Sequence, residues 1–167
     1  MFDYKISELK KKLKILGIKN GDIVYCHNNV SLFGKPRGNF DKKKFLKKVL
    51  DIIIKIIGNK GLLIFPTYTY SFSNFRNGIK FKRKEVFSKR TPTKIGALSN
   101  YSIYHKDGLR TQDPFFSCVI FGKNNKNFIR NISNNSFDEN SIFKKLLDNN
   151  AKLLNLNFKG YTIIHYM

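Results

Sequence analysis

The sequence predicts an α/β fold, a three-layer α/β/α sandwich around a mostly parallel sheet. Short apolar runs rich in Ile, Leu, Val and Phe alternate with segments whose apolar residues recur at helical spacing. The apolar runs contain few polar residues, which is typical of strands buried on both faces. The 167 residues are enough for one core, and no repeat or linker divides them. We therefore expect a single domain over residues 1–167.

The first two expected elements are an amphipathic helix and a strand. Apolar residues recur every three or four positions between lysines over residues 6–16, and Gly17 can end this helix in a left-handed conformation. Residues 22–26 form a short β-prone run, which the polar residues 27–29 follow. We expect a surface helix, then a buried strand, then a loop.

A second helix and a second strand complete a βαβ unit. Asp41 can accept a hydrogen bond from a free amide of a first turn, so we expect a helix that runs to residue 57. Gly58 follows as its terminator, and residues 61–66 follow as a buried strand. Such an order favours parallel strands joined by a helix.

A basic segment precedes the next expected helix. Residues 67–89 have no regular period, which indicates a long functional loop. Thr93 is a candidate N-cap, with Arg90 and Lys94 beside it. A helix N-terminus flanked by two cations is suited to an anion, usually phosphate. An ordinary capped helix with solvated basic side chains is the alternative interpretation.

The last expected elements are short and alternate again. Residues 117–121 form an apolar run that predicts a strand. Residues 125–132 and 141–147 have helical spacing, and residues 151–156 form the final expected strand. This alternation completes the expected α/β order.

The chain is strongly basic, with a net charge of +21 from 32 basic and 11 acidic residues. Such a charge would normally indicate nucleic acid or an anionic membrane as partner. Only six of the basic residues are arginine, however, and bidentate recognition of phosphates and bases favours arginine. Abundant Lys, Asn, Ile and Phe are instead typical of an AT-rich coding sequence. We expect no nucleic-acid partner, although the basic run 80–84 with its interleaved Phe81 keeps that alternative open.

The cysteines and the apolar segments bear on the compartment. No apolar segment is long enough to cross a bilayer, and the first residues do not resemble a signal peptide. Cys26 and Cys118 fall in expected strands and are too few for a disulfide framework or a metal cluster. We expect a cytoplasmic protein with two core thiols, no metal and no membrane partner.

Four motifs stand in order along the chain: GDIVYCHNNVS at 21–31, LIFPTYT at 63–69, RTPTKIGALS at 90–99 and YTIIH at 161–165. In this order and spacing they resemble the aminoglycoside 3-N-acetyltransferase family, also called the antibiotic N-acetyltransferases. The resemblance extends from about residue 18 to the end. It implies transfer of an acetyl group from acetyl-coenzyme A, as co-substrate, to an amine of an aminoglycoside or another amino sugar by direct attack.

The resemblance also implies a coenzyme A site built from two distant segments. The basic segment before the third expected helix suits the phosphates, and the loop after the first strand resembles the part that lines the pantetheine arm. For His27, a satisfied loop histidine is the alternative. The implied coenzyme A contacts are His27, Asn28, Asn29, Ser31, Thr67, Arg90, Thr91, Thr93, Lys94 and Gly96.

Acetyl transfer to an amine needs a base, because an ammonium has no lone pair with which to attack a thioester. In the family, a helix-capping threonine is followed after three positions by a histidine and after three more by a glutamate. Thr162 and His165 match the first two, so the resemblance implies that His165 is the base. The glutamate would fall one position beyond Met167. We therefore expect a chain without the family's C-terminal part, and an inactive remnant that keeps the coenzyme A pocket is the alternative.

Thr69 and Asp113 are the implied contacts of the amine substrate. Family members that modify drugs tend to have histidine before the proline of this segment, where this chain has Asp113 before Pro114. Polycationic aminoglycosides also call for a pocket rich in carboxylates, which this basic chain lacks. We therefore expect a singly charged amino sugar as substrate, and the sequence leaves a homodimer open.

Overall fold

The computed structural model describes residues 4–69 and 87–157, which form a five-stranded sheet in the order β3-β4-β2-β1-β5. Strands β5, β1 and β2 are parallel neighbours, whereas β4 is antiparallel to both β2 and β3. Within the described part of the chain, β4 alone runs against the other strands, so the predicted mostly parallel sheet is confirmed. The strands are β1 (Ile23–Asn28), β2 (Leu62–Pro66), β3 (Leu109–Arg110), β4 (Cys118–Phe121) and β5 (Lys152–Leu156).

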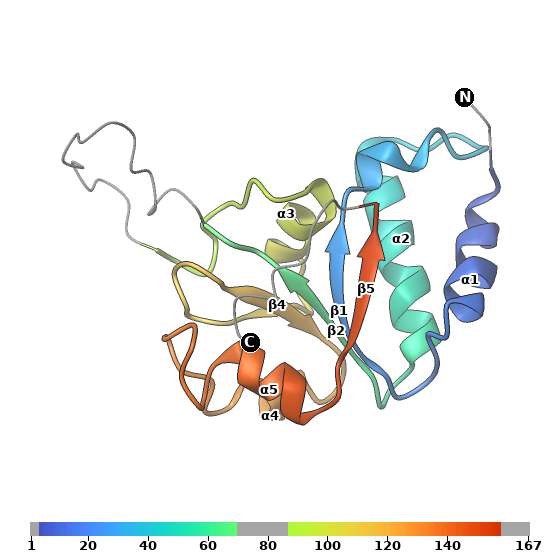
Figure 1. Cartoon of the computed structure of the whole chain (residues 1–167). Helices are drawn as coiled ribbons and strands as arrows, with labels where there is room; N and C mark the ends of the chain where they lie inside the picture. The colour runs from blue at the N-terminus through green and yellow to red at the C-terminus, as the bar shows by residue number, and fades with distance from the viewer. Residues whose placement is uncertain (1–3, 70–86, 158–167) are drawn as a thin grey trace.

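Helices cover both faces of the sheet (Figure 1). One apolar cluster joins α1, α2 and α3 to the sheet, and a second joins α4 and α5 to its opposite face. This arrangement is the three-layer α/β/α sandwich that the sequence predicts. The helices are α1 (Ile6–Ile15), α2 (Lys42–Ile57), α3 (Ala97–Ile103), α4 (Asn125–Ile129) and α5 (Ile142–Asp148), and the 3-10 helix η1 (Val30–Phe33) follows β1.

The central strands β1, β2 and β4 are buried on both faces because their alternate residues enter different clusters. In β1, Val24 and Cys26 pack toward α2, whereas Tyr25 between them packs toward α5. Cys26 and Cys118 are both fully buried free thiols, as predicted, and burial raises the pKa of each. Neither is therefore a reactive thiolate at neutral pH.

Local capping explains why two helices match their predicted ranges. Asp41 accepts a hydrogen bond from the amide of Lys44 at 2.7 Å, and Gly58 ends α2 with a φ of 65°. Ser141 likewise accepts from the amide of Lys144 at 3.2 Å at the start of α5. These signals lie within a few residues of each helix end, so the sequence reveals them.

The start of α3 differs from its prediction. Thr93 is not its N-cap, because the Thr93 hydroxyl donates to the carbonyl of Tyr68 at 2.7 Å and the helix begins only at Ala97. Gly96 is the N-cap and makes no side-chain cap. Most of the predicted loop 67–89 lies outside the described residues.

Two strand boundaries differ as well. The predicted loop residues His27 and Asn28 belong to β1, because both pair with β5 in register with Asn155 and Leu156. The short strand β3 was not predicted, since two residues carry no period.

Along 4–69 and 87–157, no helix is both long and apolar enough to cross a bilayer.

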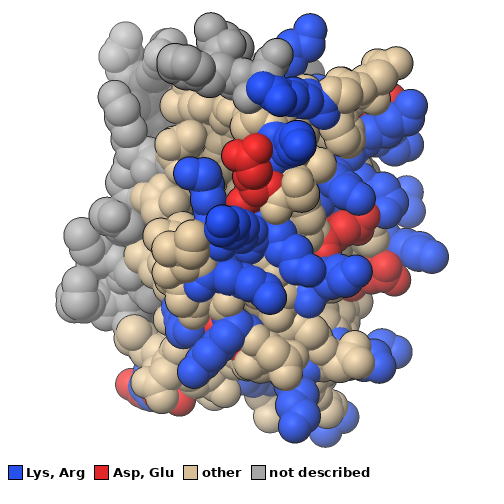
Figure 2. Space-filling model, turned by 90° about the vertical axis from the view of Figure 1, so that its right-hand side faces the viewer, with Lys and Arg blue, Asp and Glu red and all other residues tan. Residues whose placement is uncertain are grey.

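The positive charge lies largely on exposed helix surfaces. Figure 2 shows one face of the molecule on which lysine and arginine side chains surround a few acidic ones. Helices α1 and α2 carry many lysines, and exposed ion pairs such as Lys44 with Asp41 and Lys47 with Asp51 offset only part of their charge. This distribution matches the interpretation of the charge as solvated surface.

Candidate functional site

The carboxyl end of β1 meets the start of α3. The Asn28 side chain donates from Nδ2 to the hydroxyl of Ser99 at 3.1 Å. A Cβ atom on Gly96 would lie 2.9 Å from the Asn28 carbonyl oxygen, so the close approach of the two segments requires glycine here. The structure thus brings together two predicted coenzyme A segments that are far apart in the sequence. Their meeting point lies at the edge where open α/β sheets bind ligands.

Two buried threonines, Thr67 and Thr69, follow β2 beside this meeting point. Thr67 is buried and donates from its hydroxyl to the carbonyl of Ser117 at 3.0 Å. The hydroxyl of Thr69, also buried, donates to the carbonyl of Pro114. Both hydroxyls therefore donate within the protein, which gives no support to the expected coenzyme A contact of Thr67 or the expected substrate contact of Thr69.

Arg110 is not among the predicted site residues. It packs against Thr67 with 4% of its surface exposed. Its guanidinium donates to the carbonyls of Thr67, at 2.7 Å, and Thr91, and to the Ser117 hydroxyl at 3.0 and 3.2 Å. A longer bond of 3.4 Å reaches the carbonyl of Lys89. Burial lowers the pKa of Arg110 to about 10, so it stays charged at neutral pH. Arg110 therefore links three places in the chain: the residue after β2, residues 89–91, and the residue before β4.

His27 lies on the face of the sheet opposite to Asn28, because neighbouring residues of a strand alternate. It is 2% exposed, and its ring packs edge-on to Tyr25 with the centroids 5.0 Å apart. Burial lowers the pKa of His27 to about 4, so the imidazole is neutral at physiological pH. The structure therefore places His27 in the sheet and not in the predicted loop.

Asn29 and Ser31 occupy the turn after β1. The amide of Asn29 donates to the carbonyl of Leu156 at 2.7 Å, which fixes this turn against β5. The exposed Ser31 donates from its hydroxyl to the side chain of Asn29. Hydrogen bonds within the protein thus hold this turn, which continues into η1.

The basic segment runs along the flank of α3. Arg90 and Lys94 are exposed, and within the described parts of the chain neither side chain has a hydrogen bond or ion pair. The carbonyl of Arg90 accepts from the hydroxyl of Tyr104, at the far end of α3, at 3.2 Å. This bond ties the backbone of Arg90 to the end of α3, and the place of its side chain beside the helix N-terminus stays a prediction. Thr91 is half-buried and accepts from the amide of Ser88 at 2.8 Å.

Asp113 is 1% exposed and uses both carboxylate oxygens inside the protein. Oδ1 accepts from the amides of Phe115, at 2.7 Å, and Phe116, at 3.0 Å. Oδ2 accepts from the hydroxyl of Ser136 at 2.6 Å. This arrangement makes Asp113 the anchor of a turn, and it gives no support to the expected contact with an amine substrate.

The two predicted catalytic residues, Thr162 and His165, lie outside the described residues. No group of three or more His, Cys, Asp or Glu side chains that could hold a metal occurs in residues 4–69 and 87–157.

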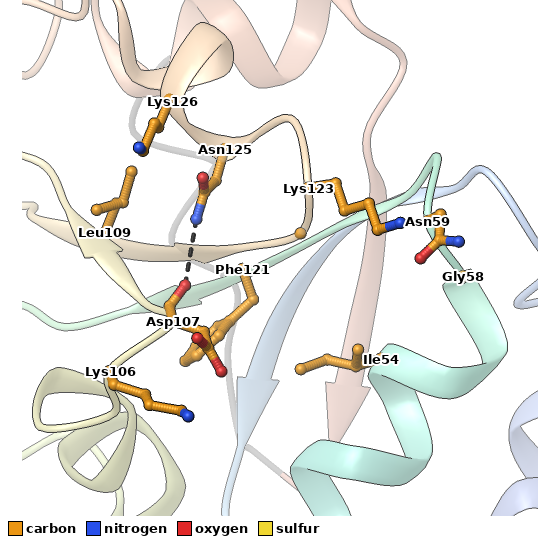
Figure 3. A pocket seen from close by; sticks show the side chains of 11 residues that line it. Ile54, Gly58, Asn59, Lys106, Asp107, Leu109, Phe121, Lys123, Asn125 and Lys126 are labelled. Atoms are coloured by element: carbon orange, nitrogen blue, oxygen red, sulfur yellow. Dashed lines mark hydrogen bonds between the residues drawn. The ribbon is translucent and has the colours of Figure 1, made fainter.

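A separate pocket of about 440 Å³ lies at the opposite edge of the sheet, beside the loops that precede β2 and follow β4 (Figure 3). In it, the Asn125 side chain donates to the carbonyl of Asp107 at 3.2 Å. None of the sequence-predicted site residues lines this pocket. Its lining residues are Ile54, Gly58, Asn59, Lys106, Asp107, Leu109, Phe121, Gly122, Lys123, Asn125 and Lys126.

Comparison with known proteins bears on this arrangement. A model of the aminoglycoside 3-N-acetyltransferase family matches residues 35–167. A comparison with curated proteins gives no match.

Solved structures share the fold at low sequence identity. The structure described as AAC-IIIb binary with CoASH has a TM-score of 0.80 at 17% identity, and AAC-VIa bound to sisomicin has 0.77 at 16%. Each match covers 99% of this chain and 64% of the solved one. The YokD protein from Bacillus subtilis has a TM-score of 0.70 at 19% identity, over 86% of this chain and 61% of that one. The chain therefore spans under two thirds of the length of these structures.

Proposed function

Because the chain belongs to the aminoglycoside 3-N-acetyltransferase family, we propose that it binds acetyl-coenzyme A and transfers the acetyl group to an amine of an amino sugar. The observation that carries this proposal is the meeting of Asn28 with Gly96 and Ser99 at the carboxyl edge of the parallel strands. Two structural neighbours support it, one described with CoASH and one with sisomicin.

Asn28 is suited to the pantetheine arm of the co-substrate. Its Nδ2 donates to Ser99, whereas its Oδ1 is buried without a hydrogen-bond partner among the described residues. A buried acceptor of this kind is uncommon and fits an additional donor. The pantetheine arm carries two amide N–H groups, and its proposed place is the edge formed by Asn28 and Gly96, where the protein itself covers Oδ1.

Arg90 and Lys94 are suited to the phosphates. Both are exposed cations on the segment that leads to Gly96. Neither pairs with a described carboxylate, so both charges are available to an anionic ligand. The helix α3 has only seven residues and contributes less to this role than the sequence suggested. The side-chain charges therefore carry the proposed phosphate contact.

The reaction needs one nucleophile and one base. The neutral amine nitrogen attacks the thioester carbonyl carbon, and the carbon–sulfur bond breaks to release coenzyme A. His165 accepts the proton that the amine loses and returns it to the thiolate, with Thr162 at the start of the same motif. A singly charged amino sugar fits this site better than a polycation, because Asp113 is occupied within its turn.

Release of coenzyme A thiol from acetyl-coenzyme A tests this function, with glucosamine and an aminoglycoside as alternative acceptors. We expect acceptor-dependent release that His165→Gln abolishes while coenzyme A binding is retained. Binding without any release would support the second candidate, a coenzyme A-binding remnant. Absence of coenzyme A binding would contradict both.

A further inference from the structure

One buried guanidinium ties the basic segment to the sheet. Arg110 donates to the carbonyl of Thr91 in the basic segment and to the carbonyl of Thr67 at the end of β2. It also donates twice to the hydroxyl of Ser117 just before β4. Thr67 and Ser117 also bond directly to each other, so Arg110 links the basic segment to a pair of strand ends that is already joined. Arg110 is therefore one of the contacts that position residues 89–91, together with the bond from the Tyr104 hydroxyl to the Arg90 carbonyl.

Arginine suits this position better than lysine would. Nε, Nη1 and Nη2 each donate, and they point to different segments from a planar fork. The ring of Phe87 lies 5.0 Å from the guanidinium carbon and covers one face of the plane. A lysine ammonium would keep the charge, but a single nitrogen could not span Thr67, Ser117 and Thr91 at once. Replacement of Arg110 by lysine would therefore remove several ties of the basic segment without removing the charge.

No described carboxylate forms an ion pair with Arg110. Its hydrogen-bond acceptors are carbonyl and hydroxyl oxygens. A buried charge that is bonded only to neutral groups projects a positive potential onto nearby surface. That surface is the segment carrying Arg90 and Lys94. Through its bond to Thr91, Arg110 adds a third positive charge next to the segment that carries Arg90 and Lys94.

We propose that Arg110 is a positioning residue for the phosphate-bearing end of coenzyme A, and this inference rests on the proposed function. Arg110 helps to hold residues 89–91 in place, so that Arg90, and Lys94 further along the segment, face the phosphates. Its own buried charge adds positive potential at this segment. It does not touch the pantetheine arm, which lies toward Asn28. The role of Arg110 is thus specific to one end of the ligand.

Two ligands that share the pantetheine arm test this role. Coenzyme A carries phosphates at its other end, whereas pantetheine carries none. In Arg110→Lys, we expect calorimetry to give about tenfold weaker binding of coenzyme A, with the affinity for pantetheine within about twofold of the original protein. The matched control is Arg130→Lys, an exposed arginine on the α4 side, which should leave both affinities unchanged.

The outcomes separate the alternatives. Equal loss of both affinities in Arg110→Lys, or no loss of either, would overturn the positioning role. If the unmodified protein does not bind coenzyme A, the proposed function itself fails. Tyr104→Phe provides a second variant should Arg110→Lys not fold, because it removes another tie to this segment, the bond from the exposed Tyr104 to the Arg90 carbonyl. It should weaken binding of coenzyme A but not of pantetheine, and unchanged binding of coenzyme A would contradict the proposal.

Discussion

The side-chain nitrogen of Asn28 lies 3.1 Å from the hydroxyl oxygen of Ser99, a buried hydrogen bond between residues 71 positions apart. It joins the last residue of β1 to the first turn of α3. Since Gly96 packs against the Asn28 carbonyl as well, this contact sets the distance between the two segments of the proposed coenzyme A site. The Asn28–Ser99 bond therefore belongs to the proposed site as well as to the core.

Removing the Ser99 hydroxyl should destabilise the protein. Ser99→Ala leaves the buried Asn28 Nδ2 without its acceptor, so we expect the free energy of unfolding in urea to fall by about 1–2 kcal/mol. Ser31→Ala is the control, because that hydroxyl is exposed and its bond is local, and it should change stability by less than about 0.5 kcal/mol. Equal effects of the two substitutions would contradict the importance of the Asn28–Ser99 bond.

The buried His27 should make stability depend on pH. Burial lowers the pKa of His27 from 6.5 to about 4. Between these values the unfolded chain takes up a proton that the folded chain does not, so the free energy of unfolding should fall as the pH falls. The full effect is at most about 3 kcal/mol, and it is complete below the folded-state pKa.

Urea unfolding between pH 7 and pH 4 measures this effect. In His27→Gln, we expect the dependence on pH in this window to be flatter by the contribution of one histidine. The control is His105→Gln, since His105 lies 3.8 Å from the carboxylate of Asp107 and is more exposed. The His27 explanation fails if His27→Gln keeps the original pH dependence.

Asp113 should matter for stability more than for substrate binding. Asp113→Asn replaces a carboxylate that accepts from two backbone amides and from the Ser136 hydroxyl, so we expect a loss of about 1–3 kcal/mol in unfolding free energy. The KM for the amino sugar should stay within about twofold. A large rise in that KM with unchanged stability would instead place Asp113 in the substrate site.

Much of the fold follows from local signals in the sequence. The helix starts at Asp41 and Ser141 were predictable because each cap lies within three residues of the amide it accepts from. The two apolar clusters, one on each face of the sheet, follow from strands that are apolar at nearly every position, as in β2. Such signals need no knowledge of distant contacts.

The predictions from sequence are wrong where contacts between distant residues determine the local structure. Thr93 resembles an N-cap, but its hydroxyl bonds to Tyr68, which is 25 positions away. The extension of β1 through His27 depends on pairing with β5 near the other end of the chain. Arg110 gave no local signal, because its acceptors come from three separate segments. The resemblance predicts the site segments, and the folded contacts show how these segments meet.

The central claim is that two distant segments form one coenzyme A site. Its most direct test is a titration of the isotopically labelled protein with coenzyme A, in which the amide chemical shifts are recorded at each step. If residues 27–31 and 90–99 form one coenzyme A site, the largest shift changes should fall on Asn28, Asn29 and the amides from Lys94 to Ser99. Arg90→Gln with Lys94→Gln should weaken the binding and reduce its dependence on salt. Shift changes centred on the pocket around Lys106, Lys123 and Lys126, or no saturable change, would contradict the claim.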